Sequence, residues 1–258
     1  MAFFVFIKKN SVLFFIVIAL AVFSCTPIKK QIYLGKGKIT SEVSNQTITN
    51  KYQLQKGDML YVKVQTLDEK SYKLFNSEWL TNASVNDLSV FLDSYTISDS
   101  GNIELPIVGK VEIFGLTLTE AQMKIQKSLS TYLLDVKVIL KLVNFKITVL
   151  GEVLKPGTFK IYDDNINVLE AISMAGDMTV FGNRENIMVL RKNTGNKYEY
   201  LDITDINIIN SEYFQLMPND VVYVQPTVAK SLGFKEFPFT IMFSAITTLL
   251  VLINFLSK

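Results

Sequence analysis

The sequence of 258 residues contains no histidine and only one cysteine, and these two absences exclude several kinds of functional site. Without histidine the chain has no imidazole base, no catalytic triad of the usual kind and no histidine-ligated metal. A single cysteine can build neither a thiolate zinc site nor a disulfide framework. We therefore expect a protein with no catalytic residues, no metal and no cofactor.

An excess of charge of one sign is also missing. The chain has 26 Lys and Arg residues against 24 Asp and Glu residues. Lys8 and Lys9 belong to an N-terminal segment that we expect to be removed, which leaves 24 charges of each sign in the mature chain. Proteins that bind nucleic acid present a strongly basic surface to the phosphates. The balance of charge therefore predicts no nucleic-acid partner.

The N-terminal segment has the composition of an export signal. The run from Ser11 to Ser24 is apolar and uncharged, about as long as the apolar region of a signal peptide and short for a bilayer span. Cys25 follows this run directly, after a small residue, and this resembles the lipobox of a bacterial lipoprotein. We expect residues 1–24 to be a lipoprotein signal peptide, with Cys25 lipidated and held at membrane lipid. The alternative is an uncleaved anchor helix in which the cysteine is incidental.

A second apolar segment lies near the C-terminus. No charged residue occurs from Phe237 to Ser257, a length of about 31 Å as a helix, so we expect a transmembrane helix within residues 229–258. Its polar side chains fall on one helical stripe, which comprises Thr240, Ser244, Thr247 and Asn254. Either these side chains bond to carbonyls of their own helix in a plain anchor, or the stripe faces other copies of the helix or a pore that they enclose.

The region between the two apolar segments contains a repeated pattern. Residues 25–50 are rich in Thr, Ser and Asn, and we expect a tether there. The segment YQLQKGDMLYVKV, from Tyr52, then aligns without gaps with FQLMPNDVVYVQP, from Phe214. Each copy predicts a turn followed by a half-buried strand with alternating apolar residues. The two copies bracket the globular part of the chain.

A further repeat lies between these copies. Two segments each predict a strand, a turn, a second strand and a helix that begins with a capping pair. The pairs are Thr117 with Glu120 and Asn167 with Glu170. We therefore expect an α+β fold with two small mixed modules, residues 51–144 and residues 145–228.

The motifs of these modules give a specific resemblance. YQLQKGD and GNIELPIVGKVEIFGLTLTEAQ resemble the export domain of bacterial outer-membrane polysaccharide export proteins. GEVLKPGTF and NVLEAISMAGD resemble the soluble-ligand-binding β-grasp domain that follows the export domain in that family. The resemblance implies a polysaccharide export domain over 51–144 and a β-grasp domain over 145–228. It also implies a lipid-anchored protein of the outer membrane whose body lies in the periplasm.

A function follows from the same resemblance. We expect a non-catalytic subunit of an export channel for capsular or exopolysaccharide. A homo-oligomeric ring would pass the polymer and dock an inner-membrane copolymerase that regulates chain length. One rival function is a periplasmic lipoprotein that binds or senses a soluble sugar and uses its C-terminal helix only as an anchor. The other rival is a polysaccharide-modifying hydrolase.

The acidic residues offer the one pattern that suggests hydrolysis. Asp163 with Asp164, and Asp202 with Asp205, are pairs of the residue type that glycosidases place on either side of the scissile bond. Both pairs fall in predicted turns and helix caps, and nothing in the pattern indicates a cleft. We therefore expect no enzymatic activity.

Other residues suggest contact with sugar, but a structural role is the simpler prediction for each. Arg184, Arg191 and Lys192 fit a solvated surface better than a site for an acidic glycan. Trp79 fits a core position better than a sugar platform. A turn over Gly151–Gly157 explains the glycines and the proline there without a ligand. The sequence therefore leaves the ligand-binding residues unknown.

Overall fold

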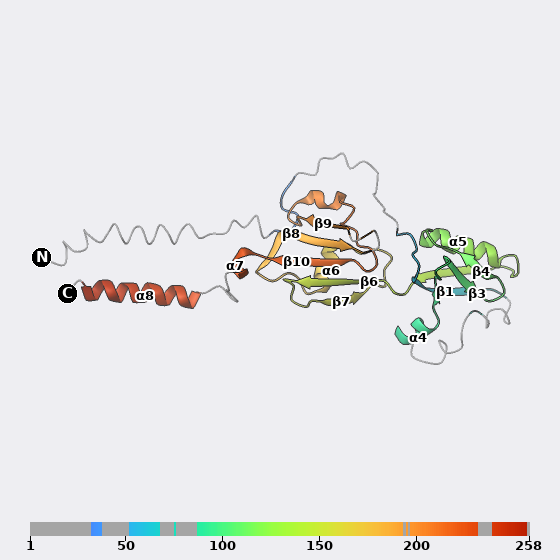
Figure 1. The fold of residues 1–258 in the computed structure, drawn as a ribbon, viewed down its shortest axis with the longest axis horizontal. Coiled ribbons are helices and arrows are strands. Elements are labelled where there is room, and N and C mark those ends of the chain that lie inside the picture. Colours follow the sequence, from blue (N-terminus) through green and yellow to red (C-terminus); the bar gives the residue numbers. More distant parts are fainter. Residues whose placement is uncertain are drawn as a thin grey trace.

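The chain folds into two adjoining α+β modules (Figure 1). The structure, a computed structural model, describes residues 32–37, 52–67, 75, 87–192, 195, 197–231 and 239–256. One hydrophobic core is built from buried side chains between Leu54 and Leu140, and a second from buried side chains between Phe145 and Val224. Leu142 packs against both cores, so the first module (residues 52–143) and the second module (residues 145–226) meet at this point.

The first module combines a three-stranded antiparallel sheet, a hairpin and a helix. Its elements are β1 (Met59–Gln65), α4 (Asp87–Leu92), β2 (Tyr95–Thr96), β3 (Asn102–Leu105), β4 (Gly109–Glu112), α5 (Leu118–Leu129) and β5 (Lys137–Leu142). The sheet has the order β2-β1-β5, and β3 pairs with β4. Leu60, Val62 and Val64 alternate into the core, as the sequence predicts for this strand. The helix α5 packs against β5 and buries Ala121 and Ile125.

The second module is a mixed five-stranded sheet with a short helix on one face. Its elements are β6 (Lys146–Gly151), β7 (Gly157–Lys160), α6 (Val168–Met174), β8 (Gly182–Arg191), β9 (Lys197–Leu201), the 3-10 helix η2 (Ile206–Asn210) and β10 (Val221–Pro226). The strand order is β7-β6-β10-β8-β9. The central strand β10 runs parallel to β6 and antiparallel to β8. A short helix, α7 (Val228–Ser231), follows the sheet.

The repeated turn-and-strand sequence has the same local structure in both modules. The backbone N–H of Gln55 donates to Oδ2 of Asp58 at 2.8 Å, and the N–H of Met217 donates to Oδ2 of Asp220 at 2.9 Å. Each aspartate directly precedes its strand, β1 or β10. Both carboxylates are buried, and this burial raises the pKa of each. The repeat therefore encodes one turn, closed from within by a buried aspartate.

Each copy of the turn also pairs with the beginning of its module's helix. Thr117 caps α5 and Asn167 caps α6, and both predicted capping boxes are confirmed. The residue before each cap accepts a hydrogen bond of 2.9 Å from the turn segment, from Leu54 in the first module and from Leu216 in the second. The same unit thus occurs twice, although it opens the first module and closes the second.

The C-terminal helix α8 covers Phe239–Leu256. Its 18 residues extend about 27 Å, less than the hydrocarbon core of about 30 Å. Within the described part of the chain, no helix combines the length and the apolar character needed to cross a membrane. This corrects the expectation of a transmembrane helix within 229–258, as far as the described residues extend.

Candidate functional site

Two of the predicted site residues lie outside the region where side chains are described. Cys25, the predicted lipidation residue, precedes the first described residue. Asn254 lies in α8, but its side chain is not among those described. Lipid attachment at Cys25 and the role of Asn254 therefore stay predictions.

The other three stripe residues lie on α8, and two of them bond within the helix. The hydroxyl of Ser244 donates to the carbonyl of Ile241 at 2.9 Å. The hydroxyl of Thr247 lies 3.0 Å from the carbonyl of Phe243 and 2.9 Å from that of Ser244. Thr240 is exposed in the first turn. These internal hydrogen bonds correspond to the plain-anchor alternative, and they lower the cost of placing the hydroxyls in apolar surroundings.

Outside the polar stripe, α8 carries large apolar side chains. Nine of them are between 42% and 77% exposed: Ile241, Met242, Phe243, Ile246, Leu249, Leu250, Val251, Leu252 and Phe255. A helix with so large an apolar surface is stable only where other apolar groups cover it. Among the described residues, these side chains of α8 have no such cover.

An unexpected contact joins the predicted tether to the second module. Residues 32–37, which we call the clasp, form backbone hydrogen bonds with the segment that follows β9. Leu34 donates to the carbonyl of Ile203 at 2.9 Å, and Lys36 donates to that of Thr204 at 2.7 Å. Ile206 donates back to the carbonyl of Lys36 at 3.0 Å. The clasp therefore adds a short parallel pairing to this side of the module.

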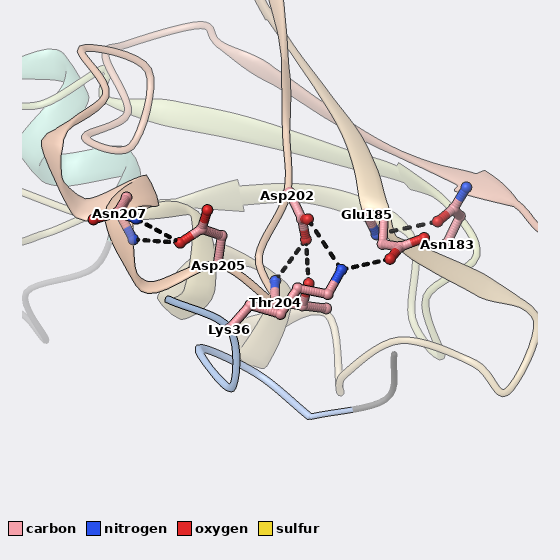
Figure 2. Close-up of polar contacts among 7 residues, drawn as sticks. All are labelled: Lys36, Asn183, Glu185, Asp202, Thr204, Asp205 and Asn207. Atoms are coloured by element: carbon pink, nitrogen blue, oxygen red, sulfur yellow. Dashed lines mark hydrogen bonds and ion pairs between the residues drawn. The ribbon is translucent and has the colours of Figure 1, made fainter. Parts of the chain in front are cut away.

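The side chain of Lys36 reinforces this pairing (Figure 2). Its ammonium group lies 2.5 Å from Oε1 of Glu185 and 3.4 Å from Oδ2 of Asp202. The backbone N–H of Thr204 donates to the other oxygen of Asp202 at 2.9 Å, which fixes the carboxylate. Asp205 accepts from the N–H of Asn207 at 2.9 Å and so caps η2. Lys36 thus joins two acidic residues that come from different parts of the second module.

Lys36 of the clasp and the acidic residues that it contacts stabilise one another's charges. Burial raises the pKa of Asp202, but the hydrogen bonds from Thr204 and the nearby Lys36 outweigh it and bring the pKa below its ordinary value of 3.8. The hydrogen bond to Glu185 is the largest of the effects that raise the pKa of Lys36. Both groups are therefore ionised around neutral pH, as the contact requires.

The apolar part of the clasp packs on the core of the second module. Tyr33 and Leu34 contact that core. The guanidinium of Arg184 lies 5.4 Å from the centre of the Tyr33 ring, and the Tyr33 hydroxyl donates to the carboxylate of Asp177. Burial, with the hydrogen bond to Asp177, raises the pKa of Tyr33 to about 12. Arg184 therefore binds the clasp rather than standing as a separate surface charge.

A second polar contact fixes the start of the C-terminal connection. Lys230 in α7 forms an ion pair with Glu152, which also accepts from the hydroxyl of Thr179 at 2.8 Å. Burial raises the pKa of Glu152, but the hydrogen bonds from Lys230 and Thr179 outweigh it, so the net pKa is lowered. Ion pairs therefore hold two segments to the second module: the clasp, which precedes the first module in the sequence, and α7, which follows the last strand.

The structure gives the remaining basic candidates different roles. Arg191 is buried: its guanidinium lies 3.3 Å from Oδ2 of Asp220 and donates to the carbonyl of Gln215 at 2.9 Å. The interpretation of Arg191 as part of a solvated surface is therefore wrong, because this residue completes the turn before β10. Lys192 follows β8 and is exposed.

The acidic and aromatic candidates also have structural roles where they are described. Asp164 forms an exposed ion pair with Lys141 at 2.9 Å, across the junction of the modules. Phe75, a neighbour of Trp79 in the sequence, is buried in the first core, whereas Trp79 lies outside the described residues. Among the described residues, no group of three or more metal-ligating side chains comes together.

Comparison with known families assigns both modules. Residues 46–143 match the family described as polysaccharide biosynthesis/export protein. Residues 145–224 match the SLBB domain. The boundary between the two matches coincides with the junction of the two hydrophobic cores at Leu142–Phe145.

Comparison with curated proteins gives two relatives of the same name. The chain is 26% identical over 186 residues to the EPS I polysaccharide export outer membrane protein EpsA of Ralstonia solanacearum, covering 68% of this chain and 48% of that protein. It is 26% identical over 149 residues to the EpsA protein of Ralstonia nicotianae, covering 54% of this chain and 38% of that protein. The chain thus spans about half the length of these relatives, or less. The two consecutive matches place the chain in the polysaccharide biosynthesis/export protein family, a family of transport proteins and not of enzymes, with an SLBB domain as its second module.

Proposed function

We propose that the chain is a non-catalytic subunit of an outer-membrane channel that exports capsular or exopolysaccharide. The observation that carries this proposal is the uninterrupted succession of an export-family module and an SLBB module over residues 46–224. Transport of a finished polymer requires a passage and no bond chemistry, so a chain without histidine suits this role. The relatives named as outer-membrane export proteins support the same compartment.

In this proposal Cys25 carries lipid and the body lies in the periplasm. Cys25 lies seven positions before the start of the clasp at Ile32, so the two are at most about 25 Å apart when the chain is fully extended. Because the clasp is bound to the second module, a lipid on Cys25 would keep that module close to the membrane. The first module would then face the periplasm and an inner-membrane copolymerase that regulates chain length.

The proposed channel is a ring in which copies of α8 pack together. The exposed apolar surface of α8 requires cover, and the stripe of Thr240, Ser244, Thr247 and Asn254 offers the small and polar contacts that join helices in apolar surroundings. The remaining apolar side chains would contact lipid or neighbouring helices. In this arrangement the stripe lines the exit or lies between adjacent copies.

A second candidate is a periplasmic lipoprotein that binds or senses a sugar and uses α8 only as an anchor. The internal hydrogen bonds of Ser244 and Thr247 favour it, because they leave these hydroxyls without need of a partner helix. This candidate requires no ring and no passage of polymer.

Deletion of the gene in its native cells separates the two functions. If the chain is an export subunit, we expect the surface polymer to disappear while polymer accumulates inside the cell envelope. Complementation with the full chain should restore export. Normal surface polymer in the deletion strain, or altered synthesis without accumulation, would contradict the export function and favour the sensing lipoprotein.

A further inference from the structure

The five-stranded sheet of the second module has two unlike faces. Side chains such as Ile147, Val189 and Val222 alternate onto the inner face, where α6 and the core bury them. The residues between them point to the opposite, outer face. Three of the outer residues at the sides of the sheet are well exposed: Leu150 is 43% exposed, Tyr198 60% and Tyr200 49%.

Strand register places the outer side chains in two adjacent rows, which together we call the outer band. The first row crosses all five strands and contains Thr158, Thr148, Val221, Leu190 and Tyr198. The second row contains Leu150, Tyr223, Met188 and Tyr200. No member of the outer band is charged, and three of its members are tyrosines. An uncovered sheet face ordinarily carries more polar side chains, so this composition indicates an interaction surface.

The outer band has lysine side chains beyond one end and amide side chains beyond the other. Lys146 and Lys160 lie opposite each other, two residues beyond the Thr148 and Thr158 pair. The hydroxyls of these two threonines lie 3.1 Å apart. Beyond the second row, at the other end, the amide of Asn186 donates to that of Gln225 at 2.7 Å.

The end of this face beyond the first row is basic. Lys192 follows β8 two residues after Leu190 and is exposed, so it extends the basic end of the face. Carboxylates occur only toward the opposite end among the described residues near this face: Asp202 follows Tyr200 by two residues, and it and Glu185 both contact the ammonium group of Lys36. An acidic ligand would therefore find positive charge at one end of the band and no opposing carboxylate along it.

These features fit a carbohydrate chain better than another protein surface. The rings of Tyr198 and Tyr200 lie edge to face with centres 5.7 Å apart, and they form a rigid aromatic pair at the edge strand β9. Sugar rings present apolar C–H faces that stack on such rings, while their hydroxyls bond to hydroxyl and amide groups. A second copy of this face would bury the tyrosine hydroxyls and bring no carboxylate to the lysines.

We propose that the outer band binds the exported polysaccharide, with sugar rings on Tyr198 and Tyr200 and acidic substituents near Lys146 and Lys192. The proposal rests on the export function proposed above and specifies where on the chain the polymer is held. It also specifies the class of polymer, an acidic polysaccharide.

Site-specific photo-crosslinking in polymer-exporting native cells tests this site. Benzoylphenylalanine replaces Tyr200 in the full chain and retains an aromatic ring there. The matched control carries the same probe in place of Glu199, an exposed residue of the same strand that alternates to the other face. We expect a polydisperse adduct that stains for carbohydrate, at least about fivefold stronger at position 200. It should be absent from cells that make no polymer.

The other outcomes overturn the proposal. A discrete adduct of two chains at position 200 would show that a second copy covers the band. Carbohydrate adducts of equal strength at positions 199 and 200, or none at position 200 while export proceeds, would show that the polymer does not bind there.

A pair of substitutions distinguishes this site from the export function itself. Tyr198→Ala with Tyr200→Ala should lower export by about fivefold or more at normal protein levels, whereas the two Tyr→Phe changes should preserve it. Tyr132→Ala, at a 61% exposed tyrosine of the first module, is the control and should have no effect. If gene deletion abolishes export but the alanine pair leaves it normal, the site is wrong and the export function stands. If deletion leaves export intact, the export function is wrong.

Discussion

At the scale of single residues, Gly151 shows how a sequence motif that resembles a ligand loop serves the fold. Its φ angle is 91°, in the region that favours glycine. A Cβ atom placed there would lie 2.0 Å from the carbonyl oxygen of Val224, on the parallel neighbour strand β10. The turn interpretation of this glycine is therefore confirmed.

Gly151→Ala should lower the free energy of unfolding by about 2 kcal/mol or more, because it combines an unfavourable φ with a clash against backbone. Urea unfolding of the full chain in detergent measures the loss. Gly157→Ala is the matched control: the φ of Gly157 is not positive, and an added Cβ atom would lie 4.0 Å from its nearest neighbour, the ring of Phe159. If the two variants are equally stable, the close approach of β6 to β10 at Gly151 does not require glycine.

The ion pair of Lys36 makes the clasp dependent on pH. Asp202 has a folded pKa below 3.8, so its contribution is complete above its unfolded pKa and is lost as pH falls through the folded value. Lys36→Met should therefore destabilise the second module at pH 7. The difference in free energy of unfolding between this variant and the unmodified chain should become smaller as the pH falls through the pKa of Asp202.

Urea unfolding at several pH values down to acid measures this difference. Lys110→Met, at an exposed lysine of the first module, is the control and should behave as the unmodified chain does at each pH. If Lys36→Met lowers the free energy of unfolding by the same amount at every pH, the ion pair does not hold the clasp.

Cys25 should be the first mature residue and should carry lipid, since its place after the apolar run is the one evident reason for the sole cysteine. Labelling of cells with radioactive palmitate tests this expectation. Cys25→Ala should abolish the label and release the N-terminal attachment. If the variant keeps both its label and its membrane fractionation, the lipobox interpretation fails.

At the scale of elements, local signals were readable from the sequence and distant pairings were not. The capping boxes at Thr117 and Asn167 were predictable because their partners lie three residues away. The clasp was not predictable, because Lys36 pairs with residues 149 and 166 positions later, and nothing in a polar stretch indicates such partners. Tyr33 and Leu34, an apolar pair within that stretch, were the available hint.

For α8, we expect the polar stripe to face other helices or the exit of the channel. Single cysteines introduced along the helix, with Cys25 blocked by lipid, should react with a small water-soluble reagent at positions 240, 244, 247 and 254. They should stay unreactive at 243, 249 and 252. If none of these cysteines reacts, α8 is a plain anchor, as the internal hydrogen bonds of Ser244 and Thr247 allow.

Substitution of the stripe provides an independent check on α8. Changing Thr240, Ser244 and Thr247 together to Leu should preserve membrane association and impair assembly or export, because the small contact surfaces are lost. Changing Leu249 and Leu252 to Ile should have little effect. Equal behaviour of the two variants would exclude a specific role for the stripe.

At the scale of the whole molecule, the order of the modules was predictable and their internal topology was not. Repeated motifs indicated the two α+β units, and the family matches confirm the export and SLBB assignments. The sequence does not reveal that β10, the last strand, lies at the centre of the second sheet beside β6. Strand order depends on pairings across about 70 residues, and periodicity carries no information on them.

The central claim is that several copies of the chain form a ring that conducts polymer. Native mass spectrometry of the full chain, extracted from its own membranes in mild detergent, tests it most directly. We expect a single closed oligomer of several lipidated copies, and monomers when residues 229–258 are removed. A full-length chain that is monomeric under these conditions would contradict the ring and leave a lipid-anchored sugar-binding protein as the better description.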